Sequence, residues 1–287
     1  MRSDPLPATT SSAFRTGKNE QALAFLREAE TLFAGVNEVG GAADAMRWQG
    51  QIHNGAGRID EALAVLQRAD ALVAPLQYVR LGSAIQNAFA VSYRLKGDVA
   101  RAVQAGESAV ANARESGDRT LESAALTSFG AAMRVKGDYA RARDAYAQAA
   151  ELSNAIGDLR NRNAALNNSG NIDYLVGDLA AARQKFETAL EVDRKLANPA
   201  GIALRLQNLS RVLALQNELA EAEKLNAEEC AIQDAIAAAE KVQAKAGAVA
   251  EQAIHVSVIK AEVEAAQGKR AAAVSRLHRA VSKLVTI

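Results

Sequence analysis

A short phrase that recurs at a fixed interval constrains the fold more than any other feature of this sequence. It begins at Gly97, Gly137 and Gly177, and its six residues read Gly-Asp-Val-Ala-Arg-Ala, Gly-Asp-Tyr-Ala-Arg-Ala and Gly-Asp-Leu-Ala-Ala-Ala. The same 40-residue register reaches positions 17, 57 and 217, and a last copy begins at 268 after 51 residues. A fixed period of roughly 20–50 residues is typical of repeat proteins, in which each unit buries its apolar face against its neighbours.

Other positions follow the same register. Ala142 and Ala149 represent two alanine columns, five and twelve residues after the start of the phrase, and Tyr146 represents a bulkier column between them. Gly130 represents a column of small residues seven positions before the phrase. Side chains seven apart lie on one face of a helix. The columns therefore predict two helices that approach closely through small side chains.

The phrase itself predicts a turn between helices. Glycine suits the left-handed conformation that ends a helix, and the following aspartate can cap the next helix. A second turn marker falls midway between phrases, at Gly117, Gly157 and Asn198. The sequence is also rich in alanine, with only 4% aromatic residues and four prolines, which favours helix. Each unit is therefore predicted to be an antiparallel pair of helices in an all-α chain.

This pattern resembles the tetratricopeptide repeat (TPR) family. The family's small, alanine, aromatic and alanine positions are matched by the four residues above and again, 40 residues later, by Gly170, Ala182, Phe186 and Ala189. The resemblance covers residues 17 to about 285, and its 40-residue period is similar to the elongated repeats of kinesin light chain and bacterial signalling proteins. It implies a right-handed superhelical solenoid of antiparallel helix pairs, with about six to seven repeats.

The register also predicts the domain organisation. Residues 1–16 are expected to be extended or disordered, and a single solenoid is expected over 17–287, its first copy keeping only a second helix from near Asn19. The 11 extra residues before position 268 predict an overlong helix, about 219–245. Because the last copy ends at Ile287 without a polar cap, we expect a piece of a longer protein. Bacterial arrays of this kind are often joined to kinases, cyclases or transcriptional regulators. The alternative is a complete short protein whose ends self-associate.

Composition and motifs argue against several classes of function. The net charge is only +1, which argues against nucleic-acid and membrane-surface partners, and no stretch approaches the roughly 18 apolar residues of a membrane span. The single cysteine, Cys230, excludes an internal disulfide, and His53, His255 and His278 lack metal-ligand spacing. We therefore expect no catalytic residues, no enzyme activity, no metal, no cofactor and a cytoplasmic location.

The candidate site is a surface. In the resembling family the first helix of each pair lines a concave groove, and the register places three columns of this chain there, on one helix face. Their amides can donate and accept hydrogen bonds, and their guanidinium groups suit carboxylates. The predicted partner is therefore a protein or an extended, acidic peptide. The groove residues are Arg47, Asn87, Thr127, Asn167 and Gln207; Gln51, Asn171 and Arg211; and Asn54, Arg94, Arg134 and Tyr174.

Three alternatives remain open. The polar face can simply be solvated. The chain can instead be an assembly or dimerisation scaffold that acts through its uncapped ends and long helix, with the groove idle. A small-ligand sensor is the third and least favoured possibility. Concentration-dependent light scattering would separate the scaffold from the peptide-binding module.

Overall fold

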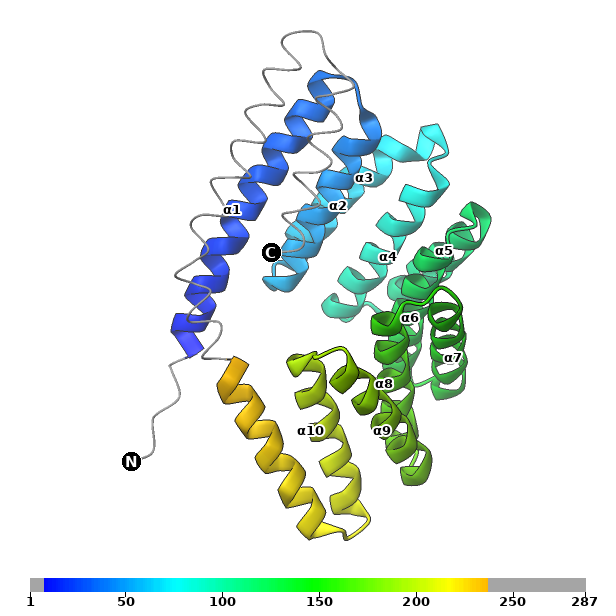
Figure 1. Ribbon diagram of the computed structural model, residues 1–287. Helices are drawn as coiled ribbons and strands as arrows, with labels where there is room; N and C mark the ends of the chain where they lie inside the picture. Colours follow the sequence, from blue (N-terminus) through cyan, green and yellow to red (C-terminus); the bar gives the residue numbers. More distant parts are fainter. Residues whose placement is uncertain (1–7, 237–287) are drawn as a thin grey trace. The chain divides into compact units, whose positions relative to one another are not determined.

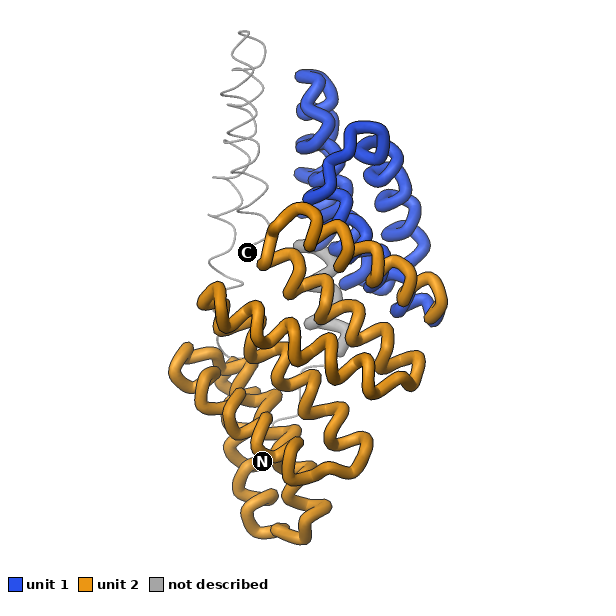
Figure 2. The backbone as a smooth tube through the Cα atoms, turned by 90° about the vertical axis from the view of Figure 1, so that its right-hand side faces the viewer, with its two compact units in different colours: residues 1–97, 249–287 blue, residues 98–248 orange. Residues whose placement is uncertain are grey.

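The computed structural model describes residues 8–236, with side chains from residue 19 onward, and all regular structure in this range is helical (Figure 1). These residues form two compact units, 8–97 and 98–236, drawn in different colours in Figure 2. A single solenoid was predicted, so the division after Gly97 is an additional feature. It falls in the copy whose bulky column holds Gly106 in place of a large side chain.

Unit 1 contains four α-helices and a short 3₁₀ helix. Each α-helix packs against the next one along the chain, and α2 also contacts α4. The elements are α1 (Ala8–Gly35), α2 (Val39–Gly55), α3 (Ile59–Val73), η1 (Ala74–Leu76) and α4 (Val79–Lys96).

The first helix differs from the prediction. It begins at Ala8, whereas residues 1–16 were expected to be extended or disordered and a turn was expected at Gly17. Gly17 instead lies inside α1. Glycine within a helix costs only about 1 kcal/mol, and the residue that follows is Lys18, which cannot cap a new helix as aspartate does in later copies. The glycine therefore does not interrupt the helix.

Unit 2 alternates two kinds of helix. We call α6, α8 and α10 its first helices, because each opens a predicted pair, and α5, α7, α9 and the helix over residues 219–236 its second helices. Consecutive helices from α5 to α10 pack against each other, and α8 also contacts both α6 and α10. The helices are α5 (Val99–Ser116), α6 (Arg119–Lys136), α7 (Tyr139–Ala155), α8 (Leu159–Leu175), α9 (Leu179–Lys195) and α10 (Pro199–Leu215).

The predicted turns at 57, 97, 137, 177 and 217 are confirmed. Gly137 and Gly177 have φ angles of +85° and +83°, the left-handed conformation expected of a glycine that ends a helix. The aspartates that follow cap the next helices: a side-chain oxygen of Asp138 accepts from the Arg141 amide at 3.1 Å, and one of Asp178 accepts from the Ala181 amide at 3.1 Å. Ala197 and Asn217 adopt the same left-handed conformation without glycine.

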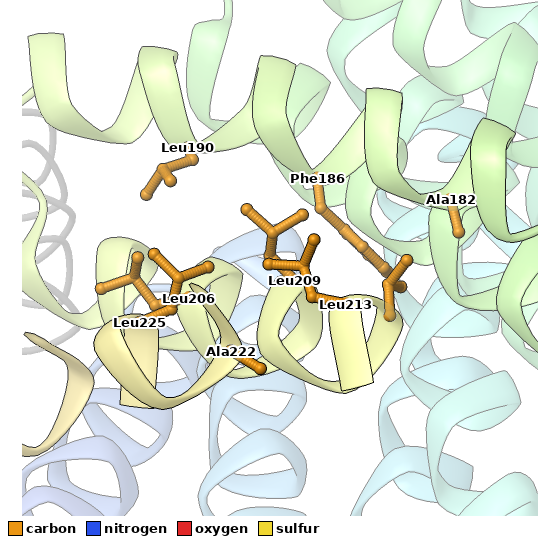
Figure 3. Packing of buried hydrophobic residues seen from close by; sticks show 9 residues of the cluster. Ala182, Phe186, Leu190, Leu206, Leu209, Leu213, Ala222 and Leu225 are labelled. Atoms are coloured by element: carbon orange, nitrogen blue, oxygen red, sulfur yellow. The ribbon is translucent and has the colours of Figure 1, made fainter. Parts of the chain in front are cut away.

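The rings of the bulky column pack directly against the small column of the preceding helix. A Cβ atom at Gly130 would lie 2.8 Å from the Tyr146 ring, and one at Gly170 would lie 2.8 Å from the Phe186 ring. These distances are too short for any larger side chain without displacing the ring. Figure 3 shows the next layer of this core, where Phe186 of α9 packs against Leu209 and Leu213 of α10.

The helix over residues 219–236 closes the described part of unit 2. Ala222 and Leu225 join the core formed by α9 and α10, and Ile232 packs against it. Helix is present where the overlong helix was predicted, up to residue 236. Residues 237–245 and the last copy at 268 lie outside the described residues.

Candidate functional site

The predicted groove columns of unit 2 lie on its three first helices. Where these side chains are exposed or half-buried, we call the surface the first-helix face. Because α8 contacts α6 and α10, the three helices present adjacent rows. The candidate residues on them are Thr127, Arg134, Asn167, Asn171, Tyr174, Gln207 and Arg211.

Tyr174 and Arg211 join two rows of this face. The guanidinium carbon of Arg211 lies 4.6 Å from the centre of the Tyr174 ring, within the range of a cation–π contact. Tyr174 is half-buried and Arg211 is exposed. The contact orients the Arg211 side chain while leaving its N–H groups available to a ligand.

Arg134, Asn171 and Gln207 complete the accessible part of the face. Arg134 and Gln207 are exposed, and Asn171 is half-buried. None of the described carboxylates forms an ion pair with Arg134 or Arg211. Helix α10 contains no Asp or Glu, and the single carboxylate of α8, Asp173, is buried. The face is therefore basic, with hydrogen-bonding capacity that this part of the protein does not use.

Asn167 and Thr127 use their side chains for hydrogen bonds within the protein. Asn167 is buried, and its side-chain oxygen accepts a hydrogen bond from the Asn208 amide group at 2.8 Å, which ties α8 to α10. The half-buried Thr127 hydroxyl donates to the Ser123 carbonyl of its own helix at 3.0 Å. Asn167 thus contributes to packing between repeats, because the neighbouring helix covers the position that was predicted to face a ligand.

The candidates in unit 1 are less accessible. Arg47 donates to Asp44 at 2.7 Å and stacks on Trp48, and Asn54 is buried and donates to Ser92 at 2.8 Å. Gln51 is exposed and Arg94 is half-buried. Asn87 is also half-buried, and its Oδ1 accepts no hydrogen bond from the described residues. Unit 1 therefore offers fewer free polar groups than unit 2.

Charges on the second helices are mostly paired. Glu107 of α5 accepts from Arg141 of α7 at 3.0 Å. Further along, Arg183 of α9 donates to Glu218 at 2.8 Å, and Arg194 donates to Glu228 at 2.7 Å. Each pair links successive second helices or the turn between them. These cations are already neutralised within unit 2.

One buried charged cluster was missed by sequence reasoning. Asp173 of α8 is only 1% exposed, and it pairs with Arg143 of α7 at 2.8 Å and with Lys185 of α9. Lys185 also donates to the Ser169 hydroxyl at 2.8 Å. A signal was present in the repeat register, because in the two neighbouring repeats the columns of Asp173 and Lys185 hold Met133, Leu213, Ala145 and Leu225.

A second buried pair was also missed. Arg205 Nε lies 3.2 Å from Asp193 Oδ2, and both side chains are almost fully buried. Burial lowers the pKa of Arg205, and the Asp193 carboxylate acts in the opposite direction. In the preceding repeat the same columns hold Ser153 and Ala165. The appearance of two opposite charges at these positions in a single repeat was therefore the signal that could have revealed the pair.

Two pockets lie between successive second helices of unit 2. One, of about 280 Å³, is lined by residues of α5, α6 and α7, including Phe129 and Arg141. The other, of about 340 Å³, is lined by α9, α10 and the helix over 219–236, including Leu209 and Leu225. Phe129 and Leu209 stand 80 residues apart, so the pockets occupy the same repeat position. The Asp173 cluster occupies the intervening repeat.

Other reactive groups do not form a site within residues 8–236. No group of three potential metal ligands occurs there, and no helix in that range has the length and apolar character needed to cross a membrane. His53 is buried, and burial and the Arg58 cation lower its pKa. Cys230 is exposed, while His255 and His278 lie outside the described range.

The chain is similar to known proteins in structure. No protein-family model and no curated protein sequence matches this chain. Solved structures do match. BtubC (BKLC) from P. vanneervenii is 19% identical, with a TM-score of 0.67 over 77% of this chain and 92% of that chain.

Two further structures have similar repeats. The TPR-like repeats of a Podosopora anserina kinesin light chain are 19% identical, with a TM-score of 0.56 over 66% of this chain and 94% of that chain. A Rap protein complexed with competence and sporulation factor is 14% identical, with a TM-score of 0.63 over 96% of this chain and 73% of that chain. At these identities the likeness concerns the fold, which confirms the resemblance drawn from the repeat columns: the chain is an all-α, tetratricopeptide-like repeat protein.

Proposed function

We propose that this chain is a non-catalytic protein-interaction module that binds an extended, acidic peptide segment across the first-helix face of unit 2. Its expected setting is the regulatory part of a larger signalling protein. The observation that carries the proposal is the difference in charge pairing. Arg141, Arg183 and Arg194 on the second helices have carboxylate partners, whereas Arg134 and Arg211 lack one among the described residues.

The chemistry of the face suits a peptide backbone with acidic side chains. Asn171 and Gln207 can both donate to a peptide carbonyl and accept from a peptide N–H. Arg134 and Arg211 can bind carboxylates through two parallel hydrogen bonds. Solved structures with this fold include a Rap protein in complex with competence and sporulation factor, which supports ligand binding as a use of such a scaffold.

A peptide array tests this proposal. Random peptides of uniform length are probed with the native protein and with a variant carrying Arg134→Ala, Asn171→Ala and Arg211→Ala. We expect the native protein to select peptides rich in Asp and Glu, and the variant to lose that selection. Binding should also weaken as salt rises, because charge-assisted contacts at an exposed face are screened.

The matched control removes two cations and one amide from the second helices. It carries Asn154→Ala, Lys195→Ala and Lys224→Ala, all at exposed positions. This control should retain the native selection, and all three proteins should melt at similar temperatures. Equal loss in the control would mean that net charge, and not the first-helix face, determines binding.

A scaffold role remains the second candidate, and one observation favours it. The helix over residues 219–236 exposes several carboxylates, including Glu221, Glu223 and Asp234, beyond its contact with α9 and α10. Such a helix could contact another subunit. Light scattering that shows growing mass with concentration, reversed by Glu221→Gln, Glu223→Gln and Asp234→Asn, would favour this role over peptide binding.

A further inference from the structure

The first-helix face carries a row of exposed aliphatic side chains that the proposed function does not explain. Val135, Leu175 and Leu215 stand 40 residues apart, in the last turns of α6, α8 and α10. Their exposed fractions are 43%, 50% and 60%. Large apolar side chains that gather on a surface mark interaction sites more often than isolated ones do.

Helix geometry places this aliphatic row beside the polar one. Leu175 lies four residues after Asn171, and Leu215 lies four residues after Arg211. Residues four apart occupy the same face of a helix, one turn along. A ligand that crosses the three first helices at the level of Asn171 and Arg211 therefore passes within one helical turn of the aliphatic row.

The spacing of the helices restricts the ligand further. Packed helices have axes about 8–10 Å apart. A peptide in the polyproline II conformation advances about 3.1 Å per residue, with three residues per turn, so three residues span about 9 Å. Side chains at every third position of such a peptide point to the same side. One peptide turn is therefore about as long as one step between packed helices, and α8 contacts both α6 and α10.

From this match we infer that the ligand is an extended peptide with an apolar residue at every third position and acidic residues between them. The apolar side chains contact Val135, Leu175 and Leu215, and the acidic ones contact Arg134 and Arg211. Charge complementarity favours this occupant, since a basic peptide would meet unpaired arginines and no carboxylate on α10. The inference rests on the proposed function and names the pattern that the face selects.

Three fluorescent peptides of about twelve residues test the pattern. The first repeats the tripeptide Asp-Ser-Leu, the second has the same composition with its leucines consecutive, and the third has serine in place of every leucine. Fluorescence polarisation should show the first peptide binding at least about tenfold more tightly than the other two. Such a factor corresponds to about 1.4 kcal/mol.

Variants connect this preference to the row. The substitutions Leu175→Ser and Leu215→Ser together should remove the advantage of the first peptide and leave binding of the third unchanged. The matched control is Leu159→Ser, which changes an exposed leucine at the opposite end of α8. Because all three positions are exposed, these variants should fold normally, and circular dichroism checks this.

The outcomes separate the inference from the proposed function. Equal affinity for all three peptides would overturn the apolar pattern and leave acidic peptide binding in place. If none of the three binds, the proposed function fails as well. Light scattering that shows self-association abolished by Leu175→Ser and Leu215→Ser, or tighter binding to phosphatidylserine vesicles than to the first peptide, would assign the row to another partner and overturn the inference.

Discussion

The two sides of unit 2 use the same residue types differently. On the second helices, Arg141, Arg183 and Arg194 each bind a carboxylate of another segment. On the first helices, Arg134 and Arg211 are exposed and lack such a partner among the described residues. Arginine occurs on both sides, but carboxylates are concentrated on the second helices, so the availability of a partner is what distinguishes the two surfaces. The comparison suggests that one surface holds the repeats together and the other is available to a ligand.

The largest effect on stability should come from Asp173, a buried residue of the first helix α8 that pairs with cations of the second helices α7 and α9. In Asp173→Asn the buried side chain loses its charge, and Lys185 and Arg143 lose their partner. Removing one member of a buried ion pair costs about 3–5 kcal/mol, and partial exposure of the two cations should reduce this to about 2–3 kcal/mol. Urea unfolding measures the change.

A surface substitution provides the reference for this experiment. Asp144→Asn changes an exposed aspartate of α7 that accepts from Gln148, and we expect it to alter the free energy of unfolding by less than about 0.5 kcal/mol. Peptide affinity should be the same in both variants. Weaker peptide binding by Asp173→Asn, at a temperature where the variant stays folded, would contradict the conclusion that one surface holds the repeats together and the other is available to a ligand.

Asn167 should have the next largest effect, and it tests whether a groove position can serve packing. Asn167→Ala leaves the buried Asn208 amide without its acceptor, which costs about 1–2 kcal/mol. The neighbouring Asn168 is half-buried, and Asn168→Ala should change stability much less. If Asn167→Ala is as stable as the native chain, Asn167 is available to a ligand after all.

Two single substitutions test directly whether charges on the second helices contribute more to stability than those on the first helices. Glu107→Gln breaks a cross-helix pair with Arg141 and should destabilise by about 0.2–0.5 kcal/mol, as expected of exposed ion pairs. Arg134→Gln removes a cation without a described partner and should not destabilise at all. Thermal melts at low salt would detect the difference, and a loss of stability in Arg134→Gln would reveal a partner for this arginine.

The smallest effect concerns pH and unit 1. Burial, assisted by the Arg58 cation, lowers the pKa of His53, so the unfolded chain takes up its proton first as the pH falls. The free energy of unfolding should therefore decrease below about pH 6.5, the ordinary histidine value. In His53→Met, which copies the residue at position 133, this decrease should be smaller. Identical pH profiles would show that other groups cause it.

Much of the fold could be predicted because the residues that determine it are close together in the sequence and recur in successive repeats. Glycine and aspartate define the turns at Gly137 and Gly177 through their own backbone preferences. The fit between Gly130 and Tyr146 follows from two columns visible in the sequence. Repetition makes each of these signals stronger than a single occurrence would be.

The site was harder to predict, because the repeat register shows which face of a helix a residue lies on but not whether a neighbouring helix buries it. The register correctly placed Asn167 and Arg211 on the first helices, but only the neighbouring helix decides that Asn167 is buried and Arg211 exposed. The Asp173 cluster depends on three helices at once. The only signal in the sequence was two charged residues at positions that are apolar in the two neighbouring repeats, which a search for local motifs does not detect.

The uniform turns of unit 2 have a consequence for how the chain can gain or lose repeats during evolution. Every helix from α5 to α10 has 17 or 18 residues. The turns between them keep a residue in the left-handed conformation even where Ala197 or Asn217 replaces glycine. A duplication or deletion of 40 residues, in phase with the joints, would therefore add or remove one row of the ligand surface without reshaping the rows beside it. The proposed ligand site can be lengthened or shortened by copying, before any single residue is altered.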